Sequence, residues 1–325
     1  MDAEHYRHLV ADLFPCASRQ GRRTSAVAVE HELLTADAQT GAVVPLDRLR
    51  AAVEGAGYAP YVGFEPGGQV ELSWPSAPDV TTLVRCVRGD LAALRAACLE
   101  AGIRLESSPV DGRPESEVPL QLDAPRYVAM QRHFDTIGPA GRRMMRRTAS
   151  TQVCLDWWAG GAGLEQWRLL NLAGPFLAAA FARPGSDRLL TWLAVDPSRT
   201  AFDGRLLRGD DPLSAYAGFA AAATPFVAAG EQHLTTLFPP VRPRGRYLEV
   251  RFPDVQEDDG IADLVAVLAA LVHDDGIRRE ALHLLAGDEH RLEQHWDVAA
   301  HGGEDVVGRG HELVALARVR LERAA

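Results

Sequence analysis

The chain has 325 residues and a formal net charge of −10, and its length suits one large domain or two small ones. Hydrophobic residues make up 47% and charged residues 24%, which is ordinary for a globular protein with a sizeable core. The negative charge argues against general nucleic-acid binding, which needs a basic surface, but small anionic substrates could still occupy a local basic pocket. All 34 basic residues are arginine, so no lysine can act as a Schiff base, a P-loop cation or a general base.

Cysteine usage and hydropathy indicate a reducing environment without a membrane partner. The four cysteines form no CxxC pair and suit neither a zinc site nor a disulfide framework; they are Cys16, Cys86, Cys98 and Cys154. The first residues do not follow the pattern of a signal peptide, and the apolar stretch around 170–182 is too short to span a bilayer. We therefore expect a cytoplasmic protein with reduced thiols.

The first half of the chain predicts a mixture of helices and strands. The expected helices lie at 3–18, 46–55 and 79–102, and the expected strands lie at 24–34, within 61–74 and at 103–110. The two strands within 61–74 flank Pro66-Gly67-Gly68, which is strong turn chemistry. Asp79 is the expected N-cap of the long helix, and a polar loop is expected over 109–122.

The second half is richer in helix. The expected helices lie at 125–136, from about 138, at 164–181, at 212–229 and from 261 onward, and the expected strands at 148–157 and 246–253. Breaks are expected at Gly287 and at Gly302-Gly303. Because the order shows no regular βαβ units, we predict an α+β fold with a mostly antiparallel sheet. We expect one catalytic domain over 1–325, with a helical C-terminal part from about 261.

Acidic side chains stand at alternate positions of two predicted strands. Glu30 and Glu32 share one face of the strand over 24–34, whose neighbours are apolar. Gln69 and Glu71 share a face after the glycine turn, and Glu65 ends the strand before it. Burying ionised carboxylates together is very unfavourable without a cation; the alternative is a sheet face or hairpin open to water. Oxygen-rich ligand sets suit Mg²⁺ or Mn²⁺ better than zinc.

A third polar row lies on the strand over 148–157, where Ser150, Gln152, Cys154 and Asp156 share one face. A buried glutamine needs hydrogen-bond partners, and a cation or a substrate could be one of them. We interpret Cys154 as a buried structural thiol rather than a nucleophile, because no histidine lies near it in the sequence.

The fourth pattern is a basic turn that precedes a strand. Tyr247, Glu249 and Arg251 share one face of the strand over 246–253, and arginines crowd the preceding residues. A basic turn before an acid suits a nucleotide whose phosphates bridge a protein cation and a metal. The alternative is a proline-stiffened surface loop over 238–246. Neither a P-loop nor a Rossmann glycine motif is present.

Arginines elsewhere could bind substrate carboxylates. A guanidinium group could bind such a carboxylate through two N–H groups at Arg126, Arg188 or Arg199. A single arginine is, however, more often a solvated surface residue. The histidines of the tail are expected at the surface; they are His283, His290 and His295.

Together these motifs resemble the glutamate–cysteine ligases, a family of carboxylate–amine ligases, and in particular the bacterial type that opens the ergothioneine pathway. The segments that carry the resemblance are Val29–Glu32, Glu65–Ser73, Pro125–Tyr127 with Met130, Gly141–Asp156, Trp192–Arg199, His233–Arg251 and the tail around Trp296. The runs EPGGQVELS and TLFPPVRPRG are specific, and the match covers nearly the whole chain.

The resemblance implies a fold like that of glutamine synthetase, a curved antiparallel sheet that holds ATP and metals, with helices behind it. It implies that ATP phosphorylates the side-chain carboxylate of glutamate and that the amino group of cysteine attacks the acyl phosphate, which forms γ-glutamylcysteine. The implied cofactors are ATP and Mg²⁺, with Mn²⁺ as an alternative. Small molecules are the expected partners, and the oligomeric state stays open.

The resemblance also assigns roles to residues of this chain. The catalytic residues it implies are Glu30, Glu65 and Arg251, and the nucleotide-binding residues are Arg244, Arg251 and Gln152. The substrate-binding residues it implies are Arg126, Thr148 and Arg188. The implied metal ligands are Glu30, Glu32, Glu65, Glu71, Gln152 and Glu249.

The chain departs from the family pattern in three places. The loop from Val110 to Leu122 is abbreviated, the stretch from Ala217 to Glu231 lacks a segment that helps to cap the site in relatives, and Ala28 replaces a glycine. The acid set remains, but the accepting amine is left open. The alternatives are the same chemistry with another amine or acid in specialised biosynthesis, or a non-catalytic regulatory paralogue.

Overall fold

A computed structural model of the chain describes residues 2–15, 23–57, 61–228 and 230–324. Within them the strands form one sheet in which every pairing is antiparallel, in the order β2-β3-β1-β5-β7-β6, with β4 paired to the far part of β1. The strands are β1 (Val27–Asp37), β2 (Val62–Phe64), β3 (Val70–Ser73), β4 (Ile103–Glu106), β5 (Thr151–Asp156), β6 (Val241–Pro243) and β7 (Tyr247–Val250). The predicted α+β class with an antiparallel sheet is confirmed.

The long strand β1 is the centre of the sheet. It pairs with β3 and β5 along its first part and with β4 along its last part. Val27, Val29 and Leu33 are buried on one face, and Glu30 and Glu32 stand on the other. This alternation separates an apolar face, which packs into the core, from a polar face that carries the acids.

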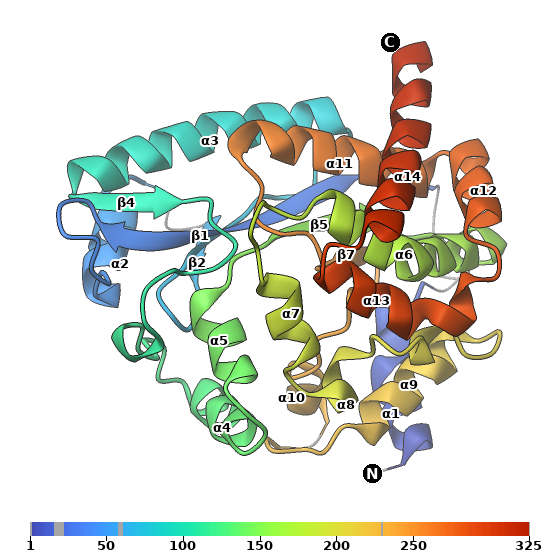
Figure 1. The fold of residues 1–325 in the computed structure, drawn as a ribbon, viewed down its shortest axis with the longest axis horizontal. Helices are drawn as coiled ribbons and strands as arrows, with labels where there is room; N and C mark the ends of the chain where they lie inside the picture. The colour runs from blue at the N-terminus through green and yellow to red at the C-terminus, as the bar shows by residue number, and fades with distance from the viewer. Residues whose placement is uncertain (1, 16–22, 58–60, 229, 325) are drawn as a thin grey trace.

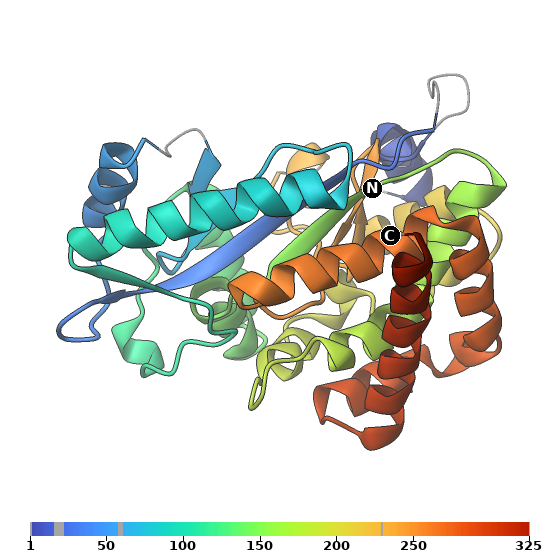
Figure 2. The same ribbon diagram turned by 90° about the horizontal axis from the view of Figure 1, so that it is seen from above.

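Two long helices cover the apolar face. α3 (Val80–Glu100) and α11 (Asp258–His273) lie side by side above the sheet in Figure 1, and Figure 2 shows them from above. Asp79 caps α3 by accepting a 2.7 Å hydrogen bond from the Thr82 backbone N–H, as predicted. Leu83, Val87 and Leu91 are buried at helical spacing beneath it.

Shorter helices lie on the opposite side of the sheet, below it in Figure 1. They are α4 (Pro125–Asp135), α5 (Ala140–Arg147), α7 (Arg188–Leu193), α8 (Pro197–Thr200) and α10 (Glu231–Leu234), with α1 (Ala3–Val10) and α9 (Pro212–Ala222) packed together beside them. Helices therefore stand on both sides of the sheet, whereas the sequence predicted helices behind it. The polar face thus faces these helices, and its acids are partly buried.

The C-terminal part is helical, as predicted. The buried helix α6 (Gly161–Ala180) packs against α12 (Asp275–Leu284), α13 (Leu292–Ala300) and α14 (Glu304–Ala324), whose end projects from the body in Figure 1. One hydrophobic cluster runs from Tyr6 to Ala317 through sheet and helices, and the single domain stays a prediction. None of the helices in the described residues is long and apolar enough to cross a membrane.

Several predicted elements differ from the observed ones at their ends. The first helix stops at Val10 and a 3₁₀ turn continues to Leu13; the rest of the predicted span touches 16–22, outside the described residues. The helix predicted over 212–229 ends at Ala222, because Pro225 disfavours helical geometry in the residue before it. The alternative of a surface loop over 238–246 is also wrong in part, since 241–243 forms β6 with Val241 fully buried.

Two side-chain predictions can also be judged. His295 is buried and bonded to Asp288 at 3.1 Å, so its predicted surface position was wrong, whereas His283 and His290 are exposed. Cys154 is a buried free thiol, as predicted, and its burial raises its pKa well above the ordinary value. Cys16 lies outside the described residues.

Candidate active site

A cavity of about 650 Å³ lies against the polar face of the sheet. Every residue to which the family resemblance assigned a role lines this cavity: Glu30, Glu32, Glu65, Glu71, Arg126, Thr148, Gln152, Arg188, Arg244, Glu249 and Arg251. They come from strands and helices that are far apart in the chain. The fold brings the predicted residues together, and their individual roles stay predictions.

Three carboxylates form a cluster at one end of the cavity. Glu32 on β1 stands directly opposite Glu71 on β3 in the strand register, and Glu65 follows the end of β2. One carboxylate oxygen from each of the three lies within 4.8 Å of the others. Such a set of oxygens matches the ligands that Mg²⁺ and Mn²⁺ prefer.

The electrostatics of this cluster also favour a cation. Burial, with repulsion from Glu65 added, raises the pKa of Glu71 to about 9, and burial with repulsion from Glu32 raises the pKa of Glu65 to about 8. Burial raises the pKa values of Glu32 and Glu30 as well. Carboxylates that repel one another in this way are stabilised by a divalent ion between them, so the residues present fit the metal that the sequence predicted.

Glu32 is held in place by groups on β5 and just before it. Its Oε2 accepts hydrogen bonds from the Ser150 backbone N–H at 2.7 Å and from Ser150 Oγ at 3.1 Å. Its Oε1 accepts a 3.0 Å bond from Gln152 Nε2. The amide oxygen of Gln152 in turn accepts a 3.1 Å bond from Arg251 Nε. Gln152 therefore links the acid cluster to the basic part of the cavity.

Glu249 has a different environment from the other acids. Its carboxylate lies 3.1 Å from Arg251 Nε, 3.2 Å from Arg244 Nε and 3.5 Å from Arg242 Nη1. Burial acts to raise the pKa of Glu249, but the three guanidinium groups outweigh it and the pKa is lowered. Glu249 is thus ionised and matched by arginines, whereas no ion pair in the described part of the chain involves Glu32, Glu65 or Glu71.

Arg242 is a residue that the sequence analysis missed. It lies on β6, its side chain lines the cavity, and burial beside Arg251 lowers its pKa to about 10. Among the described residues, Arg242 Nε and Arg251 Nη1 are buried donors without a hydrogen-bond partner. Guanidinium groups of this kind suit phosphate oxygens. The signal was present in Val241-Arg242-Pro243-Arg244, where the two arginines alternate as on a strand.

The predicted substrate-binding residues lie on the helical wall. Arg126, in the first turn of α4, is exposed and its guanidinium lies 4.4 Å from the ring centre of Tyr127. Arg188, in the first turn of α7, is buried; it donates to the Phe252 and Arg251 carbonyls at 3.0 Å. Thr148 follows α5, and its Oγ1 donates a 2.7 Å bond to the Met144 carbonyl.

Arg199 is not part of the cavity wall, so the suggestion that it binds a substrate carboxylate was wrong. Its side chain is completely buried and bonds to Asp196 at 3.0 Å and to Thr236 Oγ1 at 2.8 Å. Its guanidinium also lies 4.3 Å from the ring centre of Phe226. Arg199 therefore ties α8 to the segment after α9 and to the residues before β6.

The fold and the site define a class of protein: an α+β enzyme with buried carboxylates and arginines in one cavity, as ATP-dependent ligases that use a divalent metal have. The family model of glutamate–cysteine ligase family 2 matches residues 26–306, and the chain belongs to that family. The predicted family is confirmed, and with it the class of ATP-dependent ligases.

Individual relatives agree with the family. Glutamate–cysteine ligase EgtA of Mycolicibacterium smegmatis is 33% identical over 81% of this chain and 71% of its own length. EgtA of Mycobacterium tuberculosis H37Rv is 31% identical over 74% of this chain and 65% of its own length. A bifunctional glutathione synthetase from Pasteurella multocida aligns in structure with a TM-score of 0.47 and 15% identity, over 99% of this chain and 49% of its own. That score is too low to carry an argument.

Proposed function

We propose that the protein joins the γ-carboxylate of glutamate to the amino group of cysteine, with ATP cleaved to ADP and phosphate through a γ-glutamyl phosphate. The observation that carries the proposal is the partition of one cavity into an acid cluster and an arginine cluster, bridged by Gln152. An acid cluster suits a divalent metal, and arginines suit phosphates and carboxylates. The family relatives named glutamate–cysteine ligase support the same substrates.

The acid cluster is where Mg²⁺ would be held. Glu32, Glu65 and Glu71 supply three carboxylate oxygens within reach of one ion, with Glu30 nearby in the same cavity. When bound, the ion would neutralise phosphate charge during phosphoryl transfer. Mn²⁺ accepts the same oxygen ligands and is the alternative.

The arginines would hold the nucleotide phosphates. Arg242 Nε and Arg251 Nη1 are buried donors that lack partners, and Arg244 lies on the same wall. Arg242 and Arg251 are further held by Glu249, which fixes the direction of their guanidinium groups. Fixed donors stabilise charge that develops on the transferred group without a cost of reorganisation.

The glutamate substrate would lie against the helical wall formed by Arg126, Thr148 and Arg188, which the resemblance assigned to it. Arg126 is exposed at the rim and can fork onto a carboxylate, while Arg188 is fixed by its two carbonyl bonds. Glu30 has a raised pKa, which suits a group that takes the proton from the attacking amine. A cytoplasmic location, expected from the sequence, is part of the proposal.

One assay tests the proposal. Purified protein with ATP, MgCl₂ and glutamate should release ADP slowly or not at all, and cysteine should stimulate the release, with γ-glutamylcysteine detected by mass spectrometry. If no amine stimulates ADP release, the ligase proposal fails and a regulatory, non-catalytic role is favoured. If another amine stimulates release and cysteine does not, the chemistry stands and the proposed acceptor is wrong.

A further inference from the structure

The glycine turn between β2 and β3 is held by side chains around it. Thr35 Oγ1 donates a 3.0 Å hydrogen bond to the Gly68 carbonyl, and Gln121 Nε2 donates one of 3.0 Å to the Gly67 carbonyl. Gln69 Oε1 accepts a 2.9 Å bond from the Gly67 backbone N–H. A hairpin turn closes through its own backbone and does not need hydrogen bonds from Thr35 or Gln121. These two bonds therefore fix the position of the turn relative to the rest of the molecule.

The position of the turn sets the position of two of the clustered carboxylates. Glu65 precedes the turn and Glu71 follows it, and the Glu65 backbone N–H is bonded to the Gln69 carbonyl at 2.9 Å. Glu32, on β1, belongs to the neighbouring strand. Any shift of the turn against β1 therefore changes the distance between the oxygens of Glu65 and Glu32.

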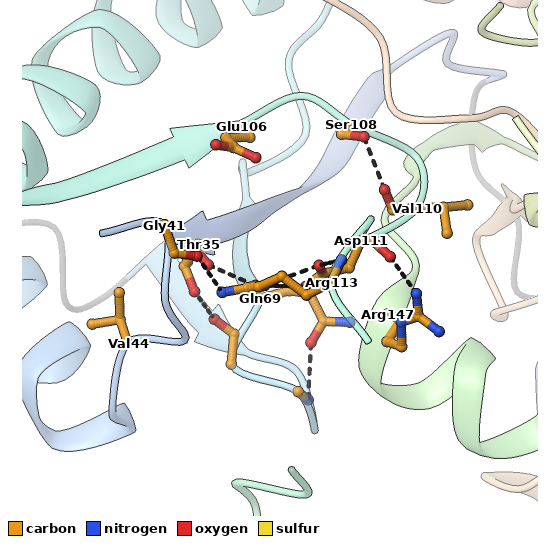
Figure 3. A network of polar contacts seen from close by, with 12 residues as sticks. Thr35, Gly41, Val44, Gln69, Glu106, Ser108, Val110, Asp111, Arg113 and Arg147 are labelled. Atoms are coloured by element: carbon orange, nitrogen blue, oxygen red, sulfur yellow. Dashed lines mark hydrogen bonds and ion pairs between the residues drawn. The ribbon is translucent and has the colours of Figure 1, made fainter. Parts of the chain in front are cut away.

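Behind the turn stands an ion pair of Asp111 and Arg113, which we term the Asp111–Arg113 clamp. Arg113 Nη2 donates a 2.9 Å bond to the Thr35 carbonyl, and Arg113 Nε donates one of 2.9 Å to Asp111 Oδ1 (Figure 3). Both residues line a second cavity of about 450 Å³, which shares no lining residue with the active-site cavity in the described part of the chain. The clamp therefore lies outside the lining of the active-site cavity.

The clamp also reaches the segment that carries Thr148 of the active-site cavity. The Asp111 backbone N–H donates a 2.7 Å bond to the Arg147 carbonyl, and Arg147 Nη2 donates one of 2.6 Å to the Asp111 carbonyl (Figure 3). Thr148, the next residue, lines the active-site cavity, and its carbonyl accepts a 2.9 Å bond from Gln69 Nε2. The clamp thus fixes the carboxylate cluster of Glu32, Glu65 and Glu71 relative to the part of the cavity wall that contains Thr148.

We propose that Arg113 and Asp111 are positioning residues for the divalent metal. By bonding the Thr35 carbonyl and Arg147, they hold the glycine turn in the place that lets Glu32, Glu65 and Glu71 converge on one ion. The inference rests on the metal site of the proposed function. Groups that orient metal ligands typically change metal affinity by about 10- to 100-fold when they are removed.

The test measures Mn²⁺ binding to the full chain by electron paramagnetic resonance, without ATP or turnover. The variants are Arg113→Met, which removes the clamp, and Thr35→Val, which removes the hydroxyl bond to Gly68 with little change of shape. Arg104→Met is the matched control, because Arg104 lines the same second cavity but pairs with Glu106 on its own strand. We expect Arg113→Met and Thr35→Val each to weaken Mn²⁺ binding about tenfold or more, and Arg104→Met to leave it within about twofold.

A double variant shows whether Arg113 acts through Thr35. If both lie on one path to the turn, Thr35→Val combined with Arg113→Met should bind Mn²⁺ about as weakly as the weaker single variant. A purely structural role would lower the melting temperature of Arg113→Met in EDTA but leave the Mn²⁺ affinity of the folded protein unchanged, which would overturn the proposal. If Arg113→Met does not fold, Thr35→Val decides by the same criterion. Absence of Mn²⁺ binding in the unaltered protein would instead overturn the metal site itself.

Discussion

Gln152 joins two groups of opposite charge. Its amide nitrogen donates to Glu32 and its amide oxygen accepts from Arg251, at 3.0 and 3.1 Å. A neutral side chain with one donor end and one acceptor end can serve both neighbours without adding charge of its own. This explains a glutamine at a buried position of a central strand.

Arg242 offers a test of the arginine cluster at the residue scale. Arg242→Met removes a buried donor without a partner, while Arg244 and Arg251 still neutralise Glu249. We expect the KM for ATP to rise about tenfold, the scale of one charge-assisted hydrogen bond, with the melting temperature within a few degrees of the unaltered protein. Steady-state kinetics at varied ATP check this. Arg246→Met, an exposed arginine of the same hairpin that does not line the cavity, should behave like the unaltered protein.

Single residues show what the sequence could and could not predict. The sequence analysis found the acids of the cavity because burying carboxylates on an apolar strand costs free energy unless they share a ligand. These acids are Glu30, Glu32, Glu65 and Glu71. Arg242 was missed because the prolines around it favoured a loop. The full environment of Glu249 could not be predicted, since Arg242 reaches it through the pairing of β6 with β7.

At the scale of elements, strand pairing decides which side chains meet. The predicted strand over 24–34 is observed as β1 over 27–37, because its last residues pair with β4, about 70 residues further along the chain. Local sequence patterns do not contain that contact. β6 contains Pro243 and still forms a strand, because it lies at the edge of the sheet, where a missing N–H costs no ladder bond. The turn and the helices 46–55 and 79–102 were predicted well because their signals are local.

The glycine turn gives a prediction at this scale. A Cβ atom on Gly67 would lie 2.0 Å from the carbonyl oxygen of Arg146, so Gly67→Ala must push the turn away from α5. We expect at least a tenfold loss of Mg²⁺-dependent ADP release and a melting temperature lower by several degrees, because backbone atoms cannot yield as a flexible side chain can. Gly138→Ala, where a Cβ would meet nothing within 4 Å, is the control and should change neither quantity. Unchanged activity in Gly67→Ala would contradict the tight packing of the turn.

At the scale of the whole molecule, the acid cluster makes stability depend on pH and metal together. Burial raises the pKa of Glu71 from 4.5 to about 9 and that of Glu65 to about 8, so the folded state holds these protons more tightly than the unfolded chain. Without metal, the tighter binding of these protons therefore stabilises the folded state fully below pH 4.5. This stabilisation is lost as the pH rises through 8 to 9. A bound cation should reverse that loss, because it favours the ionised carboxylates.

Thermal unfolding in EDTA and in MgCl₂ at pH 6 and pH 8.5 checks this. We expect the melting temperature in EDTA to fall by several degrees between the two pH values, and the gain on adding MgCl₂ to be larger at pH 8.5. Glu71→Gln, which keeps the shape but cannot ionise, should flatten the pH dependence and reduce the gain from MgCl₂. A melting temperature that is independent of pH in EDTA would show that the cluster does not carry buried charge.

The strand order lays these charges out as a gradient. Acids occupy β3, β1 and the end of β2, and the neutral Gln152 occupies β5. Arg242 and Arg251 lie on β6 and just after β7, where with Arg244 they outnumber the single acid Glu249. Where these acids are ionised, the cavity carries an electric field that runs across the strands, from the arginine side to the acid side. A triphosphate with a bound cation is itself a dipole, and only one of its two orientations lowers its energy in such a field. The antiparallel sheet would thus select the direction in which the nucleotide enters, before any single contact to it is made.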